Sequence, residues 1–320
     1  MYNQACVVIK YFAILLCSIS GVKTKGSDST VDIILTYVRI PPVRTYYVCQ
    51  QFEISDDLTL HVTRFEPIIN SSAIHHMLLF GCEFDMETRS PHPCIGLDYR
   101  CRSWMVKWDV GMEGVIDMPD VAGVRIGKGS FKYLLLQIHW NNPQLRGDLT
   151  DQSGFRLHVT TRLRPYDVGN VQIGQNKINI PGMTSSTAVS GTCPGLCTQL
   201  MLPAPIHLTE VYLHMHGLGV KAAIDIIKDR EVWTRLAEER DYDYQRPTWH
   251  HLRPAAIFEP GNSLRLTCWY DSNAGPRVRQ NATYFGQGSQ AEMCYAFIRY
   301  YPRVMGFDQC IQNGTINLNC

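Results

Sequence analysis

The sequence predicts an all-β protein built from two consecutive antiparallel β-sandwich domains of jelly-roll-like form, with a cleft between them. The chain has 320 residues, which is enough for two domains that each bury a core. Short runs rich in β-branched and aromatic residues recur along it, separated by clusters of turn-forming residues. Many short strands with turns between them are typical of antiparallel sandwiches rather than of a parallel α/β sheet.

The strand signal is carried by short segments along the whole chain. They are Val31–Ile40, Tyr133–Trp140, Phe155–Leu163, Val211–Val220, Ser263–Tyr270 and Cys294–Tyr301. In the third of these, alternate side chains are apolar and fall on one face, as in a half-buried strand. A helical pattern is found only in Val232–Arg240.

The first 30 residues differ from the rest. Lys10 precedes the apolar run Tyr11–Ile19, and small residues follow it. This order is typical of a secretory signal peptide, which we place at residues 1–21, with a buried N-terminal helix as the alternative. The run is shorter than the ~20 residues of a membrane span, and no later stretch is long and apolar enough to be a transmembrane segment. We expect a soluble protein, secreted or in the lumen of the secretory pathway.

Cysteine usage agrees with secretion. Of 12 cysteines, Cys6 and Cys17 fall in the signal region, and the even number that remains indicates disulfides. The spacing Cys193-x3-Cys197 leaves a zinc site as an alternative, although no second pair accompanies it. Glycosylation sequons begin at Asn70, Asn281 and Asn313.

A domain boundary is expected near residues 163–165, because the mature cysteines divide into even groups on either side. We therefore expect domains at residues 31–165 and 166–320. The formal net charge of +1 gives no reason to expect nucleic acid or an acidic membrane surface as a partner.

The eleven histidines are unevenly placed. On a strand, His214 and His216 would point to the same face and could share a metal ion; the alternative is a solvated strand face. Adjacent histidines such as His75-His76 point to opposite faces, so both can bind one ion only if the backbone bends or the rings use different nitrogens. Imidazole suits copper and zinc, and a thioether ligand favours Cu(I).

Four motifs then occur in order along the chain. They are His75-His76-Met77-Leu78-Leu79-Phe80-Gly81-Cys82, Leu136-Gln137-Ile138-His139, Cys193-x3-Cys197-Thr198-Gln199-Leu200 with Leu213-His214-Met215-His216, and Glu292-Met293-Cys294. Together they resemble the signature of the copper type II, ascorbate-dependent monooxygenases, and the third resembles the dopamine-hydroxylase branch. The resemblance covers about residues 35–310.

This resemblance implies two copper ions, with ascorbate as electron donor and O2 as co-substrate. Its implied ligands are His75, His76 and His139 for an electron-transfer copper, and His214, His216 and Met293 for the catalytic copper that meets oxygen and substrate. It assigns no ligand role to His250-His251, which we interpret as structural or surface residues. The implied disulfides are Cys49–Cys94, Cys82–Cys101, Cys268–Cys294 and Cys193–Cys310, which leaves Cys197 to pair with Cys320.

The substrate positions depart from the peptide-hydroxylating branch. Tyr212 stands where that branch has an arginine that holds the peptide carboxylate, and Tyr295 and Phe297 stand where it has Asn and Tyr. Loss of the arginine removes a bidentate carboxylate contact, and no acidic partner for an amine is evident near the motifs. We therefore expect a dopamine-hydroxylase-like enzyme that hydroxylates a C–H bond of a small organic molecule, with Tyr212, Tyr295 and Phe297 as pocket candidates.

Three alternatives stay open at this point. They are peptidylglycine α-hydroxylating activity, a catalytically silent secreted copper-binding protein, and a disulfide-rich adhesion sandwich without metal.

Overall fold

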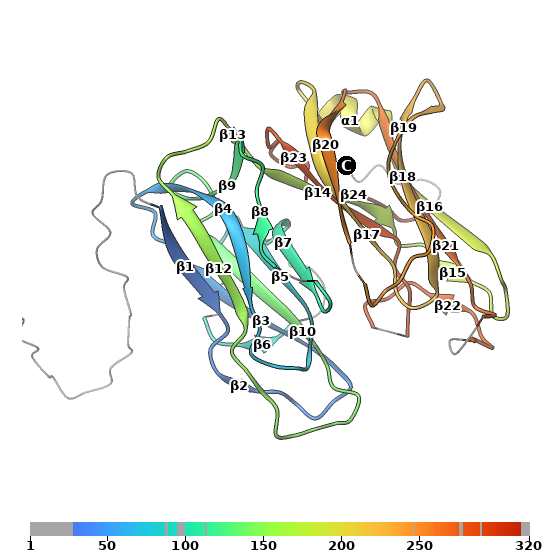
Figure 1. The fold of residues 1–320 in the computed structure, drawn as a ribbon, viewed down its shortest axis with the longest axis horizontal. Helices are drawn as coiled ribbons and strands as arrows, with labels where there is room; N and C mark the ends of the chain where they lie inside the picture. The colour runs from blue at the N-terminus through green and yellow to red at the C-terminus, as the bar shows by residue number, and fades with distance from the viewer. Residues whose placement is uncertain are drawn as a thin grey trace, which may run out of the picture.

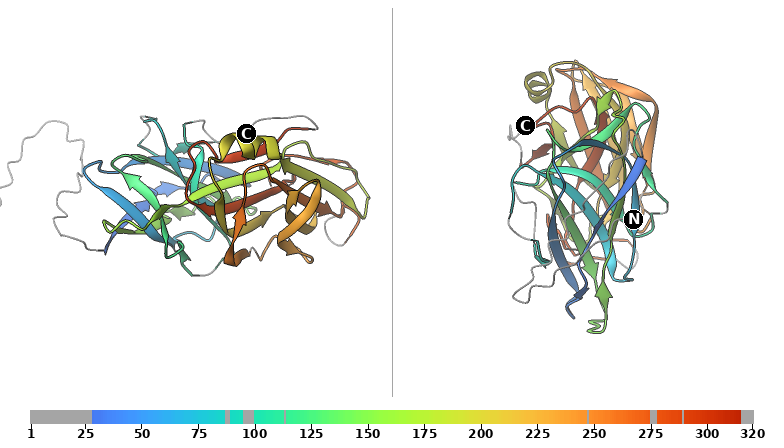
Figure 2. Two further views of the ribbon diagram at one scale, coloured as in Figure 1. Left: turned by 90° about the horizontal axis from the view of Figure 1, so that it is seen from above. Right: turned by 90° about the vertical axis from the view of Figure 1, so that its left-hand side faces the viewer.

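The computed structural model describes residues 28–86, 89–94, 100–112, 114–246, 248–274, 278–288 and 290–314. Strands dominate this part of the chain, and its one helix is the short α1 (Gly195–Met201). The predicted all-β class is confirmed. The sheets form two groups that lie side by side along the long axis of the molecule (Figures 1 and 2). The predicted signal peptide, residues 1–21, lies outside the described residues.

The first group of sheets comes from the N-terminal half of the chain. One sheet has the order β1-β12-β4-β9-β13, with β8 paired to β4: β1 (Asp28–Ile34), β12 (Gly154–Thr160), β4 (Thr59–Ile68), β9 (Ala122–Gly127), β13 (Tyr166–Asp167) and β8 (Ile116–Asp117). Another has the order β6-β3-β10-β5-β7: β6 (His92–Pro93), β3 (Thr45–Glu53), β10 (Tyr133–Asn141), β5 (Ile74–Cys82) and β7 (Ser103–Asp109). A small ladder joins β2 (Val38–Arg39) to β11 (Thr150–Asp151).

These two sheets share one apolar core. Phe65 and Phe155 from one sheet and Leu79 and Leu136 from the other are completely buried in it. Full burial of such a side chain contributes roughly 1.5–3 kcal/mol. The apolar side chains at alternate strand positions, which predicted the strands, therefore form the core that joins the two layers into a sandwich.

The second group of sheets comes from the C-terminal half. One sheet has the order β20-β17-β23-β14-β24: β20 (Trp249–Phe258), β17 (Ile206–His214), β23 (Tyr295–Tyr301), β14 (Gly169–Gln175) and β24 (Gln309–Gln312). It packs on the order β16-β21-β18-β19: β16 (Thr187–Cys193), β21 (Ser263–Tyr270), β18 (Gly219–Lys228) and β19 (Glu231–Glu239). A small ladder joins β15 (Asn179–Ile180) to β22 (Thr283–Tyr284).

The two faces of strand β17 pack against different parts of the molecule. Val211 and Leu213 lie in the core between the C-terminal sheets. Tyr212, which alternates with them, packs instead against residues of the N-terminal half. The face of β17 that carries Tyr212 and His214 is thus part of the contact between the two halves.

Two local expectations were wrong. Val232–Arg240, predicted to be helical, is mostly β19, because pairing with β18 and burial of Leu236 outweigh a weak helical preference. The segment Val211–Val220 is two strands, since β17 ends at His214 and β18 begins at Gly219. A Cβ at Gly219 would lie 2.7 Å from the Cβ of Met215, so this tight turn needs a glycine.

Disulfides brace both halves. The implied bridges Cys49–Cys94, Cys82–Cys101, Cys193–Cys310 and Cys268–Cys294 are all formed. The bridge expected between Cys197 and Cys320 ends on a residue outside the described part of the chain. The bond of Cys193 to Cys310 removes the zinc alternative for the Cys193-x3-Cys197 pair.

Strand β13 and a groove lie at the junction between the two halves. Residues 166–167 form β13, which pairs with β9 and so belongs to the N-terminal sheet. A groove of about 1390 Å³ opens between the halves; its walls include Trp108, Glu210 and Trp249. Across the described segments, no helix has the length and apolar character needed to cross a membrane.

The asparagine of each predicted sequon is exposed, as glycosylation requires; they are Asn70, Asn281 and Asn313. The pair His250-His251 lies on β20, where its rings contact the carboxylates of Glu239 and Glu210 at 3.0 Å.

Candidate metal centres

A β-bulge resolves the geometry of the adjacent histidines. Strand β5 pairs with β10 so that His76 lies opposite His139, while the next pair joins Ile74 to Trp140. His75 is therefore the extra residue of a bulge, which bends the strand and redirects its side chain. This is the backbone bend that adjacent histidines need in order to share one ion.

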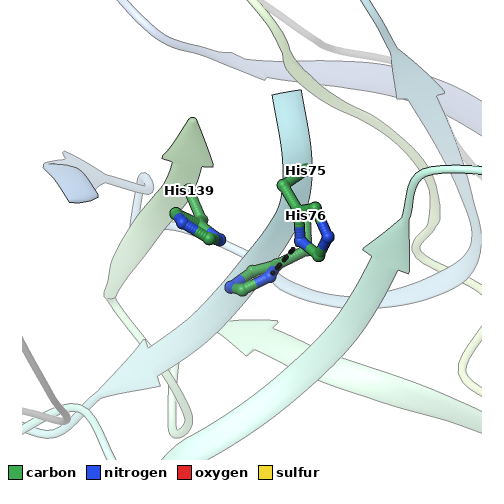
Figure 3. A group of neighbouring side chains, drawn as sticks. All are labelled: His75, His76 and His139. Atoms are coloured by element: carbon green, nitrogen blue, oxygen red, sulfur yellow. Dashed lines mark hydrogen bonds between the residues drawn. The ribbon is translucent and has the colours of Figure 1, made fainter. Parts of the chain in front are cut away.

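The three imidazoles converge. His75, His76 and His139 each offer a ring nitrogen within 4.8 Å of the others, and the rings gather around a common point (Figure 3). The Nδ1 atoms of His75 and His76 are 3.4 Å apart. The Nδ1 of His139 is buried and has no hydrogen-bond partner among the described residues.

The outer nitrogens of two rings are already engaged. The Nε2 of His139 lies 2.7 Å from Thr45 Oγ1, and the Nε2 of His75 lies 2.6 Å from the Tyr244 hydroxyl oxygen. Such contacts fix the orientation and tautomer of metal-binding imidazoles. They leave the δ nitrogens as the donors directed at the common point.

Electrostatics keep these rings neutral. Burial lowers the pKa of His139 to about 3 and that of His76 well below its usual value, with smaller contributions from neighbouring histidines and Lys107. A metal binds the neutral imidazole, so no proton has to be displaced near neutral pH. The Tyr47 ring stacks on His139 with 4.3 Å between centroids and further restricts that ring.

A second pair of imidazoles lies in the C-terminal half. His214 is the last residue of β17, and His216 lies in the turn that follows, so the expectation of two histidines on one regular strand was wrong. Their ring centroids are nevertheless 5.3 Å apart. The Nδ1 of His216 contacts the Ala291 carbonyl oxygen at 2.9 Å, which leaves its Nε2 available. The Nδ1 of His214 is buried without a partner in the described part of the chain.

The backbone of Met293 is linked to that of His216 through Glu292. Strand β23 pairs with β17 so that Tyr295 lies opposite His214, and Met293 comes two residues before this pair. The Glu292 carboxylate accepts the backbone N–H of His216 at 2.8 Å and that of Met293 at 3.3 Å. Burial raises the pKa of Glu292 to about 7. This one side chain ties the two segments together.

The donor sets fit copper. Three converging imidazoles, and a pair of imidazoles to which Met293 would add a thioether, are nitrogen and sulfur donors of the kind that copper accepts in both oxidation states. Two buried imidazole nitrogens without hydrogen-bond partners among the described residues, His139 Nδ1 and His214 Nδ1, belong one to each set. Buried polar atoms are rarely left without a partner, and a metal ligand bond satisfies this need.

Tyr244 joins the two sets. Its ring stacks on His75 at 5.3 Å between centroids and meets the edge of His216 at 5.7 Å. The histidines of the two halves therefore face each other across the domain contact, with one tyrosine ring touching both sets.

Comparison with known proteins identifies the family. Residues 31–147 match the family described as copper type II ascorbate-dependent monooxygenase, N-terminal domain, and residues 166–319 match the corresponding C-terminal domain. The chain belongs to the copper type II ascorbate-dependent monooxygenases. Every residue of both candidate donor sets lies within the matched ranges.

Curated relatives agree with this assignment. The chain is 33% identical over 297 residues to tyramine beta-hydroxylase of Caenorhabditis briggsae, covering 87% of this chain and 49% of that protein. It is 30% identical to dopamine beta-hydroxylase of Homo sapiens, covering 86% of this chain and 46% of that protein. It is 30% identical to DBH-like monooxygenase protein 1 of Mus musculus, covering 85% of this chain and 47% of that protein. The chain spans about half the length of these relatives.

The predicted pocket residues lie between the halves. Tyr212 and Phe297 are buried, and their rings are 6.1 and 6.4 Å from that of His214. The Tyr295 hydroxyl donates to Asn176 Oδ1. Trp104 of the N-terminal half meets Phe297 edge to face at 5.2 Å. The structure thus brings an aromatic wall to the His214 side of the domain contact.

Sequence reasoning missed the charged residues at this wall. The Tyr212 hydroxyl donates to Asp109 Oδ2 at 3.0 Å, and Asp109 pairs with the Lys107 ammonium. Both charged residues are on β7, whose residues are all buried. Burial lowers the pKa of Lys107, and the Asp109 carboxylate opposes that effect. The available signal was two charges at positions i and i+2 of an otherwise apolar run.

Proposed function

We propose that this chain is a copper- and ascorbate-dependent monooxygenase that transfers one oxygen atom of O2 to a C–H bond of a small aromatic molecule. One observation carries the proposal: two donor sets suited to copper face each other across the domain contact, with Tyr244 touching both. Family membership supplies the reaction class. The names of the relatives, which include tyramine and dopamine hydroxylases, support an aromatic substrate.

The two sets take different roles in this proposal. His75, His76 and His139 hold the electron-transfer copper, whereas His214, His216 and Met293 hold the copper at which O2 and substrate meet. Bound copper supplies one-electron exchange between Cu(I) and Cu(II), with ascorbate as the reductant, and a thioether ligand favours Cu(I).

The protein's own residues position and shield these groups. Thr45 and Tyr244 orient the first set through its outer nitrogens, and Glu292 holds the backbone of the second set. The rings of Tyr212 and Phe297 exclude water beside His214 and leave an aromatic surface for the substrate. Such positioning and exclusion of water are what a protein adds to cofactor chemistry.

Domain organisation and location belong to the same proposal. Residues 31–165 supply the first set, residues 166–320 supply the second, and residues 1–21 direct secretion or entry into the secretory lumen. The disulfides formed between described residues support an oxidising compartment. Peptide hydroxylation has less support, because Tyr212 contacts Asp109 and offers no guanidinium to a peptide carboxylate.

The test is oxygen incorporation by the full chain. Protein loaded with copper is supplied with ascorbate, ¹⁸O2 and a panel of phenols, arylalkylamines and glycine-extended peptides, and products are analysed by mass spectrometry. One ¹⁸O atom per product, lost in the His214→Ala variant, is the expected result. Two bound coppers without any product would indicate a silent copper-binding protein, and failure to bind copper would indicate a metal-free sandwich.

A further inference from the structure

Lys107 occupies an unusual position for a lysine. Its side chain is almost completely buried, and its ammonium pairs with the Asp109 carboxylate. The same ammonium lies 4.6 Å from the centre of the Tyr212 ring and 5.8 Å from that of Phe297. Strand β7 of the N-terminal half thus places a cation against aromatic rings of the C-terminal half.

These surroundings are those that proteins use to bind an ammonium ligand. A carboxylate and the faces of aromatic rings are the groups that together stabilise a cation removed from water. Here the cation is the protein's own. The carboxylate of Asp109 already interacts with Lys107 and Tyr212, and the Lys107–Asp109 pair as a whole carries no net charge.

The pair is also close to the proposed reaction centre. Tyr212 and Phe297, which lie beneath the Lys107 ammonium, are the rings packed beside His214. When an arylethylamine is hydroxylated at its benzylic carbon, its ammonium is two bonds from that carbon, so an amine that reacts beside His214 would carry its charge close to these rings.

We propose that Lys107 fills the position at which the ammonium of an amine substrate would bind, so that the substrate of this chain is an aromatic molecule with no positive charge beside the reacting carbon. The inference rests on the proposed function in treating the bound molecule as a substrate. It concerns binding, however, and is tested without turnover. A second ammonium beside Lys107 would be repelled, because like charges a few ångströms apart interact strongly in a site that excludes water. An anionic substrate gains little, because Asp109 already neutralises Lys107.

The test compares three ligands that share a 4-hydroxyphenylethyl group and differ in the charge of the group at its end. They are tyramine, 4-ethylphenol, which is tyramine without its amino group, and 3-(4-hydroxyphenyl)propanoate, which carries a carboxylate instead. Their dissociation constants for the full copper-loaded chain are measured by equilibrium dialysis without ascorbate. We expect 4-ethylphenol to bind at least tenfold more tightly than either charged ligand.

Lys107→Met then removes the internal cation and leaves Asp109 free to pair with a ligand. We expect the ratio of tyramine to 4-ethylphenol affinity to rise on the order of 100-fold. The double variant Lys107→Met with Asp109→Asn should return the ratio to the wild-type value, since the carboxylate is gone. Lys221→Met is the matched control, because Lys221 also lies over an aromatic ring, the indole of Trp269 at 4.8 Å, and pairs with Glu238 at 3.0 Å.

Removing Lys107 leaves a buried carboxylate, so the single variant can lose stability. Lys107→Gln keeps a donor for Asp109 while removing the charge, and it should show the same change in direction. The inference is overturned if wild type binds tyramine as tightly as 4-ethylphenol, if it prefers the carboxylate, or if it binds none of the three. It is also overturned if folded Lys107→Gln leaves the ratio unchanged. Failure of the oxygen-incorporation test alone would overturn the proposed function and not this inference.

Discussion

Tyr244→Phe tests whether the domain contact sets the copper affinity of the first histidine set. The hydroxyl oxygen of Tyr244 lies 2.6 Å from His75 Nε2, and the tyrosine comes from the other half of the chain. When copper is held through Nδ1, the Nε2 carries a proton and donates it to this oxygen. The substitution deletes the acceptor and keeps the ring.

The expected effect follows from the role of such outer contacts. Removing the hydrogen-bond partner of a metal-bound imidazole typically costs 10–100-fold in metal affinity, or about 1.4–2.8 kcal/mol. We expect the upper part of this range, because the contact is short and the Tyr244 ring is well packed between the two sets. Thr45→Val should weaken copper binding through His139 to a similar extent, although Thr45 lies in the same half as its histidine.

The assay is a competition titration of metal-free protein against a chromophoric copper chelator, read at both sites. Tyr284→Phe is the control, since Tyr284 is 59% exposed. Unchanged affinity of the first site in Tyr244→Phe, alongside a clear loss in Thr45→Val, would show that the tyrosine does not support His75. Weakening of both sites to an equal degree would also contradict the reasoning, because the hydroxyl touches only His75.

Further outcomes follow from the same geometry. Met293→Ile should abolish hydroxylation while leaving the fold intact, and X-ray absorption of the Cu(I) form should lose its sulfur signal; retained activity removes Met293 from the site. In metal-free protein, burial lowers the pKa of His139 from 6.5 to about 3, so the ring is neutral at neutral pH. The free energy of unfolding should therefore decrease by up to about 5 kcal/mol as the pH falls from 6.5 to about 3, because the unfolded chain binds the proton first. Urea unfolding of His139→Gln should lack this part of the pH dependence. Replacing Cys268 and Cys294 with alanine should lower the free energy of unfolding by about 2–5 kcal/mol in urea titrations, and an unchanged midpoint would show that the bridge does not limit stability.

The fold class could be predicted because alternation along a strand is a local property. Tyr133–Trp140 and Ser263–Tyr270 appear almost unchanged as β10 and β21. Where local propensity and tertiary pairing favour different conformations, a local sequence pattern predicts the wrong secondary structure. The charged segment Val232–Arg240 has helix-forming residues, but β18 offers it a strand to pair with, and pairing decides its conformation.

The candidate site could be predicted only in part. The histidine pairs are visible in the sequence, whereas the bulge at His75 depends on how β5 pairs with β10. The contact of Tyr244 with His75 and that of Tyr212 with Asp109 each join residues more than 100 positions apart. No local pattern encodes such a contact, because it exists only once the two halves have docked.

Directional hydrogen bonds add to the apolar packing between the two halves. Ser103 Oγ donates to Asp308 at 2.6 Å, and Asn170 Nδ2 donates to the Trp104 carbonyl oxygen at 2.9 Å, both across the contact and in addition to the Tyr212–Asp109 bond. Apolar surfaces can slide over one another at little cost, but a buried hydrogen bond is lost by a small displacement, and its groups are then left without partners. We infer that these bonds, rather than either sandwich alone, fix the separation of the two histidine sets. Weakening them should therefore change the coupling between the copper sites before it changes the affinity of either one.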